Sequence, residues 1–202
     1  MISDSRAPLS LAAASGSRIE LLGVEVTRDK VRARGEIIDA GEQPFALTND
    51  WVLDSAWQSR RLHLHLRSSA VRGLVIERTG KASWRVGGHE RPDLSGCDEI
   101  DLSATPFCNT LALRRFGRPP GGAGEMMALF VAFPALQLAP SRQRYEQAAP
   151  HEFVYFDLGC YAGFQASILV DEDDFVRRYE DLFERISGPL PASDPSPRQP
   201  RV

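Results

Sequence analysis

The alternation of apolar and basic residues around residue 64 constrains the fold of this chain more than any other feature. Three leucines alternate there with basic side chains: Leu62, Leu64 and Leu66 against Arg61, His63, His65 and Arg67. A period of two places the two sets on opposite faces of an extended chain. The pattern predicts a β-strand with one buried face. Such a strand needs a neighbouring strand on one or both sides.

Further strand signals follow at short intervals, separated by turn residues such as Gly80-Lys81 and Gly87-Gly88. The segments are Leu74 to Arg78, Ser83 to Val86, Thr110 to Arg115, Met126 to Phe133, Phe153 to Phe156 and Phe164 to Val170, and another begins near Gln137. Many short strands with turns between them are typical of an antiparallel sandwich or an open barrel. We therefore expect a mostly β domain.

One segment near the end of the chain has a different period. Its apolar residues recur at spacings of three and four: Phe175, Val176, Tyr179, Leu182, Phe183 and Ile186. The acidic run Asp171 to Asp174 before them suits the positive end of a helix dipole, and Gly188-Pro189 after them is a stop signal. The pattern predicts a C-terminal amphipathic helix packed on the β structure.

The length of 202 residues fits one domain, since all-β domains of about this size are common. We place that domain at residues 18–187. Residues 1–17 are expected to form a loose N-terminal extension. Residues 188–202 are rich in proline and polar side chains, and such a tail has too little apolar surface to offset its ordering entropy. We expect this tail to be disordered.

Charge and cysteine content narrow the functional classes. The chain has 24 basic and 27 acidic residues, a net charge of −3, which argues against a broad nucleic-acid-binding face. The chain has an odd number of cysteines, and none form a CxxC pair: Cys97, Cys108 and Cys160. We therefore expect a reducing compartment, the cytoplasm, rather than the periplasm or secretion. No apolar run is long enough to span a membrane. We expect no cofactor, and the sequence predicts no oligomeric state.

Residues 96–115 carry the most specific motif. It holds Asp101-Leu102, then Thr105-Pro106, then Asn109-Thr110-Leu111, and it ends on Arg114-Arg115. With Asp54 to Arg60, Gln137 to Tyr145 and Phe164 to Arg185, it resembles the bacterial family described as "putative glycolipid-binding" over about residues 50–186. One departure is Leu111-Ala112, where the family has Leu-Pro. The match before residue 50 is weak.

The resemblance implies a curved antiparallel sheet that forms a partial barrel, similar to bacterial lipoprotein and lipid carriers. No activity and no ligand-binding residue is established for the family, and a shared fold does not by itself define a function. The function class that the resemblance favours is noncatalytic binding of an amphipathic ligand, such as a glycolipid or a fatty-acid derivative.

Such a ligand needs an apolar cavity for its tail and a polar or aromatic rim for its head group. The candidate cavity residues are Leu62, Leu64, Leu66, Met126 and Phe130. The candidate rim residues are Trp57, Arg60, Trp84, Asp98, Asp101, Asn109 and Arg114. The competing interpretation is that the apolar residues meet one another in a filled core, which is what apolar alternation usually means.

Two other functional classes stay open. A hydrolase or metal-dependent enzyme could use the His63-x-His65 pair, whose side chains share one strand face, or the region of Asp98 and Asp101. However, no spacing supplies a third metal ligand, and two residues three apart on an extended chain point to opposite faces. The other class is an interaction scaffold without a small ligand. No GxSxG, P-loop or GxGxxG motif is present.

Overall fold

The computed structural model describes residues 4–5, 9–13, 16–116 and 122–187. The strands are β1 (Asp4–Ser5), β2 (Leu9–Ala13), β3 (Arg18–Val26), β4 (Lys30–Asp39), β5 (Phe45–Asp54), β6 (Ser59–Arg67), β7 (Val71–Arg78), β8 (Trp84–Val86), β9 (His89–Glu90), β10 (Glu99–Leu102), β11 (Ala123–Ala132), β12 (Gln137–Ala149), β13 (Glu152–Asp157), β14 (Gln165–Val170), β15 (Val176–Tyr179) and β16 (Phe183–Ser187). One 3₁₀ turn, η1 (Pro92–Leu94), and one α-helix, α1 (Phe107–Phe116), complete the described elements.

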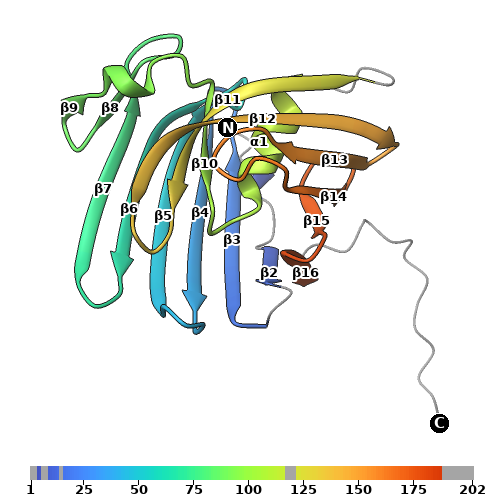
Figure 1. The fold of residues 1–202 in the computed structure, drawn as a ribbon, viewed down its shortest axis with the longest axis horizontal. Helices are drawn as coiled ribbons and strands as arrows, with labels where there is room; N and C mark the ends of the chain where they lie inside the picture. The colour runs from blue at the N-terminus through green and yellow to red at the C-terminus, as the bar shows by residue number, and fades with distance from the viewer. Residues whose placement is uncertain (1–3, 6–8, 14–15, 117–121, 188–202) are drawn as a thin grey trace.

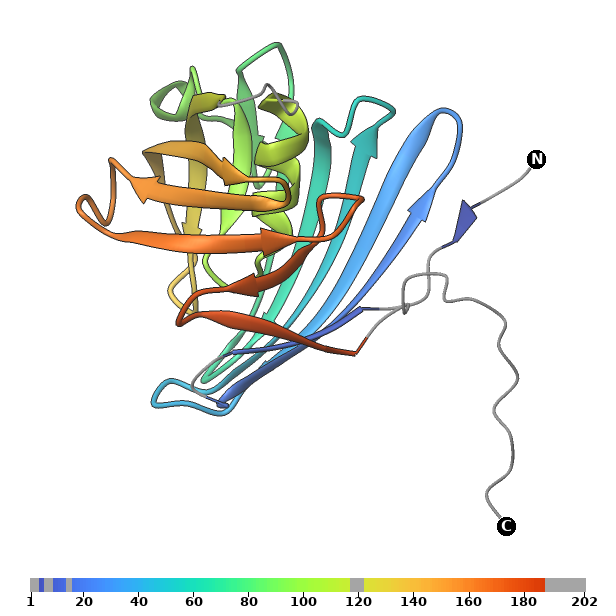
Figure 2. The ribbon, with the colours of Figure 1, turned by 90° about the vertical axis from the view of Figure 1, so that its right-hand side faces the viewer.

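All sixteen described strands belong to one sheet. Its order runs β10-β11-β12-β13-β14-β15-β16-β2-β3-β4-β5-β6-β7-β8-β9, with β1 paired to β3. The pairs are antiparallel except β10 with β11, which is parallel. The sheet bends so that β3 to β7 form one long wall and β12 to β16 form a second wall, with α1 between them (Figure 1, Figure 2). The mostly β fold with a curved, partial-barrel sheet is therefore confirmed.

The central strand predicted from alternation is β6. Leu62, Leu64 and Leu66 are buried, while His63 and His65 on the other face are exposed. Its neighbour is β7, which contains the predicted strand segment Leu74 to Arg78 and pairs Leu74 with Leu64. The alternation holds because only one face of this wall is covered by the rest of the molecule.

The predicted C-terminal helix is wrong. Residues 176–187 form β15 and β16, which pair Tyr179 with Phe183 across a tight turn. Asp181 in that turn has a φ of 59°, a left-handed conformation that a helix cannot accommodate. The apolar spacing that suggested a helical stripe instead comes from residues that face each other across a hairpin.

The segment Thr110 to Arg115, predicted as a strand, lies within α1. The Thr105 hydroxyl accepts a hydrogen bond from the Phe107 N–H at 3.1 Å, and Pro106 occupies the position just before the helix. Residues 107–113 are all buried. The two alternating leucines, Leu111 and Leu113, are therefore buried residues of a short helix enclosed by the sheet.

Residues 9–13 differ from the loose extension expected for residues 1–17. They form β2, which pairs with β16 on one side and with β3 on the other, so this strand joins the two walls of the sheet. The predicted tail, residues 188–202, lies outside the described residues. No helix among the described residues is long and apolar enough to cross a membrane. The helix α1 has 10 residues and spans about 15 Å, about half of a bilayer core.

The core has two parts. The larger lies between the first wall and α1, and includes Trp51, Leu62 and Phe107. The smaller lies between the end of α1 and the second wall, and includes Tyr155 and Tyr179. The helix thus packs against the concave side of β4 to β8, and the cavity described below lies toward β13 to β16.

Candidate functional site

A cavity of about 320 Å³ opens between β10, α1 and the second wall of the sheet. It is lined on one side by the end of β10 and by α1, and on the other by β13, β15, β16 and the loop 158–164. Its position follows from the fold, because the other half of the concave surface is filled by α1. Ligand cavities of this size lie near the lower end of the usual range of about 300–1,000 Å³.

Aromatic side chains make up much of the lining. They are Phe130, Tyr155, Tyr161, Phe164, Tyr179 and Phe183. Tyr155 holds two of them in place, with its ring centroid 6.0 Å from that of Tyr179 and 6.2 Å from that of Phe164. Tyr161 packs edge-on against Phe130 at 5.7 Å. The contacts fix these rings against one another, which keeps their remaining faces available to a ligand.

Asp101 supplies the first carboxyl group of the cavity. It stands on β10, and the Gln143 side-chain amide donates a hydrogen bond to it at 2.5 Å. Burial raises the pKa of Asp101 to about 6, the Gln143 hydrogen bond opposes this, and the negative charge of Asp157 adds to the rise. The charged form of this group is therefore less favourable than that of an exposed aspartate.

Asp157 supplies the second carboxyl group, at the end of β13. Its Oδ1 accepts the N–H of Gly159 at 2.8 Å and of Tyr161 at 3.0 Å, and its Oδ2 accepts the Tyr155 hydroxyl at 3.0 Å. Asp157 thus orders the loop 158–164 that forms one wall of the cavity. Asp157 was not among the residues predicted from the sequence, because an Asp two residues before a Gly is an ordinary turn signal.

Asn109 adds an amide to the same cavity from α1. Its carbonyl oxygen accepts the Tyr145 hydroxyl at 2.9 Å, and this contact orients the amide. Of the rim residues predicted from sequence, Asp101 and Asn109 line the cavity. They come from one motif, but their meeting place depends on the bend between β10 and α1.

The remaining predicted rim residues lie elsewhere. The Arg114 guanidinium stacks on Trp57, with Cζ 3.9 Å from the ring centroid, and donates a hydrogen bond to the Asp173 carbonyl at 2.6 Å. Arg60 forms an ion pair with Asp54 at 2.6 Å. None of these three candidates, Trp57, Arg60 and Arg114, lines the cavity.

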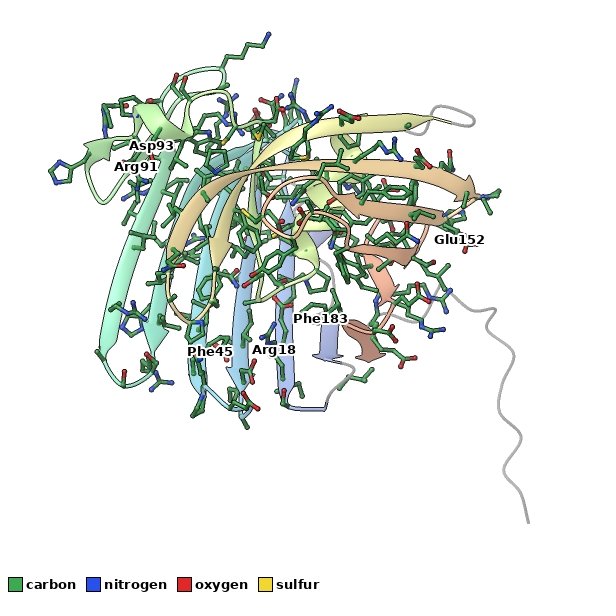
Figure 3. The ribbon with its side chains drawn as sticks, in the orientation of Figure 1. Arg18, Phe45, Arg91, Asp93, Glu152 and Phe183 are labelled. Carbon is green, nitrogen blue, oxygen red and sulfur yellow. The ribbon has the colours of Figure 1, made fainter. Side chains whose placement is uncertain are left out.

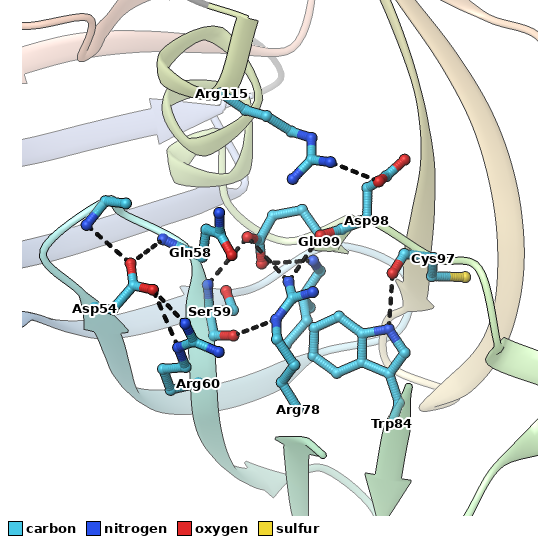
Figure 4. A network of polar contacts seen from close by, with 12 residues as sticks. Asp54, Gln58, Ser59, Arg60, Arg78, Trp84, Cys97, Asp98, Glu99 and Arg115 are labelled. Atoms are coloured by element: carbon cyan, nitrogen blue, oxygen red, sulfur yellow. Dashed lines mark hydrogen bonds and ion pairs between the residues drawn. The ribbon is translucent and has the colours of Figure 1, made fainter. Parts of the chain in front are cut away.

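Trp84 and Asp98 belong to a structural network (Figure 4). Trp84 is 1% exposed, and its indole N–H donates to the Cys97 carbonyl at 3.0 Å, so it cannot stand at a rim. The Asp98 carboxylate pairs with Arg115 at 2.7 Å and accepts the Met127 N–H at 3.0 Å. Asp98 and Asp101 therefore do not meet, because Asp98 lies just before β10 and pairs with Arg115, whereas Asp101 lies on β10 and lines the cavity.

Most of the predicted cavity residues are core residues. Leu62, Leu64 and Leu66 pack in the larger core part, and Met126 in the smaller one. Phe130 does line the cavity. The leucines are covered because α1 fills the space in front of them, so the filled-core interpretation holds for that half of the sheet.

His63 and His65 lie on the outer face of the sheet, in a shallow depression shared with Arg34 and Asp50. Both side chains are exposed. Within residues 4–5, 9–13, 16–116 and 122–187, no group of three or more His, Cys, Asp or Glu residues is arranged to hold a metal ion.

Comparison with known proteins places the chain in a family. The family model described as "Putative glycolipid-binding" matches residues 12–185. The chain belongs to this family. The resemblance noted over residues 50–186 is thus confirmed, and the match extends to β2. All the residues that line the cavity lie within the matched range.

A solved structure supports the same assignment. The crystal structure of a DUF1089 family protein from Pseudomonas aeruginosa is similar, with a TM-score of 0.72 and 30% sequence identity. The similarity covers 83% of this chain and 92% of that chain. No match was found among curated proteins.

Proposed function

We propose that this member of the glycolipid-binding family binds an amphipathic ligand, such as a glycolipid, in the cavity between β10, α1 and the second wall, without catalysis. The observation that supports this most directly is the lining itself. Six aromatic rings share the cavity with two carboxyl groups and one amide. This combination of a large apolar surface and a few oriented polar groups is typical of ligand sites.

The polar end of the cavity suits a head group rich in hydroxyls. Each hydroxyl carries a donor and an acceptor, and the carboxyl oxygens of Asp101 and Asp157 accept hydrogen bonds while the Asn109 amide offers both functions. The tyrosine rings provide flat apolar faces for the C–H surface of a sugar. A glycosyl head group would therefore find partners for both of its surfaces.

The outer part of the cavity suits the start of a hydrocarbon tail. Tyr161, Phe164 and Leu182 line it and are 58%, 38% and 37% exposed, so they form an apolar mouth. Each methylene that leaves water there contributes about 0.8 kcal/mol. A cavity of about 320 Å³ has no room for a complete lipid, so most of a long tail would stay outside it.

Native mass spectrometry tests the proposal. We expect the purified protein to carry an excess mass of several hundred daltons that is lost on denaturation, with a matching lipid in an organic extract. Phe164→Ser at the mouth should lower the fraction of protein that retains the ligand. Val71→Ser serves as the matched control, because Val71 on β7 is 68% exposed. A native mass equal to that of the protein chain alone, together with no binding of added alkyl glycosides in calorimetry, would refute the proposal.

One observation favours a second candidate, hydrolysis in the same cavity. Asp101 and Asp157 line it from different strands. Two carboxyl groups at one site are the usual catalytic groups for hydrolysis of a glycosidic bond. Asp101, with a pKa of about 6, has the value expected of a proton donor. Release of nitrophenol from nitrophenyl glycosides, lost in Asp101→Asn, would support this candidate; no release from a broad panel would exclude it for those substrates.

A further inference from the structure

The charge of the cavity indicates which head group it takes. We propose that the cavity selects an amphiphile whose polar head carries a protonated amine, as an amino sugar does, over neutral or acidic head groups. This inference rests on the proposed binding function and specifies the chemical class of its ligand.

Carboxylates outside the cavity have basic partners that those inside it lack among the described residues. On β10 and just before it, Asp98 pairs with Arg115, and Glu99 pairs with Arg78 at 3.4 Å. Asp101, on the same strand, has no basic partner among the described residues. A positively charged ligand would supply the partner that the protein itself provides for the neighbouring acids.

Asp157 likewise has no basic partner in the part of the chain that the structure describes. Its three hydrogen bonds come from two backbone N–H groups and a tyrosine hydroxyl, all of them uncharged donors. Among the described residues, the side chains that line the cavity include no lysine, arginine or histidine. Two acidic groups thus face one cavity without a compensating charge in the described part of the chain, and such a cavity favours a cation.

One basic side chain, Arg18, contacts two residues of the cavity lining, Ser103 and Phe183. Its guanidinium lies 5.7 Å from the centroid of the Phe183 ring, and it donates to the Ser103 carbonyl at 3.1 Å (Figure 3). It is also held by Asp39, with the ion-pair atoms 2.6 Å apart. Because Asp39 balances its charge, Arg18 leaves the acidic character of the cavity in place.

The aromatic lining adds a second, independent preference. Six rings surround the space next to the two acids. The faces of aromatic rings attract cations, and ammonium groups are bound in this way by cages of tyrosine and phenylalanine. An anionic head would be repelled by both features. An organic cation also fits better than a metal ion, since no metal-type cluster occurs in the part of the chain that the structure describes.

The test uses dodecyl glucoside and two charged probes that each differ from it in one substituent: dodecyl glucosaminide, with an amine at C2, and dodecyl glucuronide, with a carboxylate at C6. Calorimetric titration of the full chain, below the critical micelle concentrations, measures each affinity. We expect the glucosaminide to bind at least about tenfold more tightly than the glucoside, the difference of one charge-assisted hydrogen bond, and the glucuronide to bind most weakly.

Two variants localise the effect. Asp101→Asn and Asp157→Asn each remove a charge and keep one carbonyl oxygen. At residue 157 this oxygen can still accept the Gly159 and Tyr161 N–H groups, and the amide N–H can donate to the Tyr155 hydroxyl. The fold should therefore persist, as thermal unfolding will show. Each should bring the glucosaminide-to-glucoside ratio close to one. Asp93→Asn removes an exposed acid beside Arg91, far from Phe183 in Figure 3, and should leave the ratio unchanged.

The outcomes separate the two proposals. A glucoside that binds as tightly as the glucosaminide would overturn the inferred head-group charge and leave the proposed binding function standing. A preference for the amine that persists in both Asn variants would also overturn it, because the selectivity would then arise outside this cavity. If none of the three probes binds, the inference and the proposed function fail together.

Discussion

The charge of Asp157 acts on Asp101 across the cavity, although β11 and β12 separate their strands in the sheet. Burial contributes most to the raised pKa of Asp101, and the neighbouring carboxylate adds to it. Both acids also lie close to Tyr155 and Tyr179, whose pKa values are raised by burial and by these charges. In this acidic cavity, a negative charge on one group therefore disfavours ionisation of the others.

The first prediction concerns stability and pH. The pKa of Asp101 is about 6 in the folded protein and near 3.8 without its surroundings, so between about pH 4 and pH 6 the folded state binds more protons than the unfolded chain. Stability from this group must then fall as pH rises through that window. Asp101→Asn cannot ionise, so the stability of this variant relative to wild type should increase between about pH 4 and pH 6 and then level off.

Urea denaturation of both proteins at several pH values checks this prediction. Asp157, Gln143 and Cys108 are unchanged in the variant, so the pH dependence of the difference in stability comes from Asp101 and its charge interaction with Asp157. A difference that does not change with pH would mean that Asp101 titrates as an ordinary exposed carboxyl group.

The second prediction compares two glycines in adjacent strands. A Cβ added to Gly35 would lie 2.4 Å from the side-chain nitrogen of buried Asn49 and 2.9 Å from an oxygen of buried Glu20. A Cβ added to Gly23 would meet only the Arg34 carbonyl, at 4.0 Å. We expect Gly35→Ala to destabilise the protein by about 1–3 kcal/mol, because its polar neighbours must move in a packed interior.

The matched substitution Gly23→Ala should be neutral or slightly stabilising, since it only restricts the unfolded chain. Thermal or chemical denaturation of the two variants measures the difference. Equal stability of both variants would show that the space over Gly35 can relax and that the close approach of Glu20 and Asn49 is not a constraint.

The third prediction separates structure from binding at Trp84. Trp84→Phe removes the hydrogen bond to the Cys97 carbonyl and part of a ring that lies 4.2 Å from the Arg78 guanidinium. A buried carbonyl left without its partner costs about 1–3 kcal/mol. We expect the free energy of unfolding to fall by about this amount, while the affinity for an alkyl glycoside stays the same. A large loss of affinity at unchanged stability would restore Trp84 to the ligand site.

The fourth prediction concerns His63 and His65. Both are exposed on the outer face of β6, away from the cavity, so changing both to alanine should alter stability by no more than about 0.5 kcal/mol each. Ligand affinity should also be unchanged. Elemental analysis before and after the double substitution checks the rival interpretation, because a metal lost with these side chains would support a metal-dependent enzyme.

Much of the sheet could be predicted from the sequence, because a strand with one covered face shows an alternation of apolar and polar residues. Leu62, Leu64 and Leu66 alternate with basic residues, and their burial in β6 depends only on which face of the wall is covered. The motif containing Asp101 and Asn109 was also visible, and both residues reach the cavity. The family assignment rested on the same local pattern and is borne out over residues 12–185.

Spacing alone did not distinguish a helix from a hairpin. Tyr179 and Phe183 are four residues apart, which suits one helical face, but they are also paired residues across the turn of β15 and β16. The choice depends on β2, which offers its edge to β16 and so stabilises an extended chain there. In the same way Leu111 and Leu113 alternate like strand residues, yet the enclosure of α1 by the sheet buries every residue from 107 to 113.

The sequence by itself determined the strand-forming segments, the buried face of the first wall and two of the polar groups in the cavity. Tertiary structure alone decided where the space remains and what surrounds it. Closure of the sheet through β2 brings Phe183 and Tyr179 opposite β10, and α1 fills the other half of the concave surface. Asp157 joins Asp101 only through this closure, because a cavity is made by contacts between residues distant in sequence, and local periodicity carries no information about them.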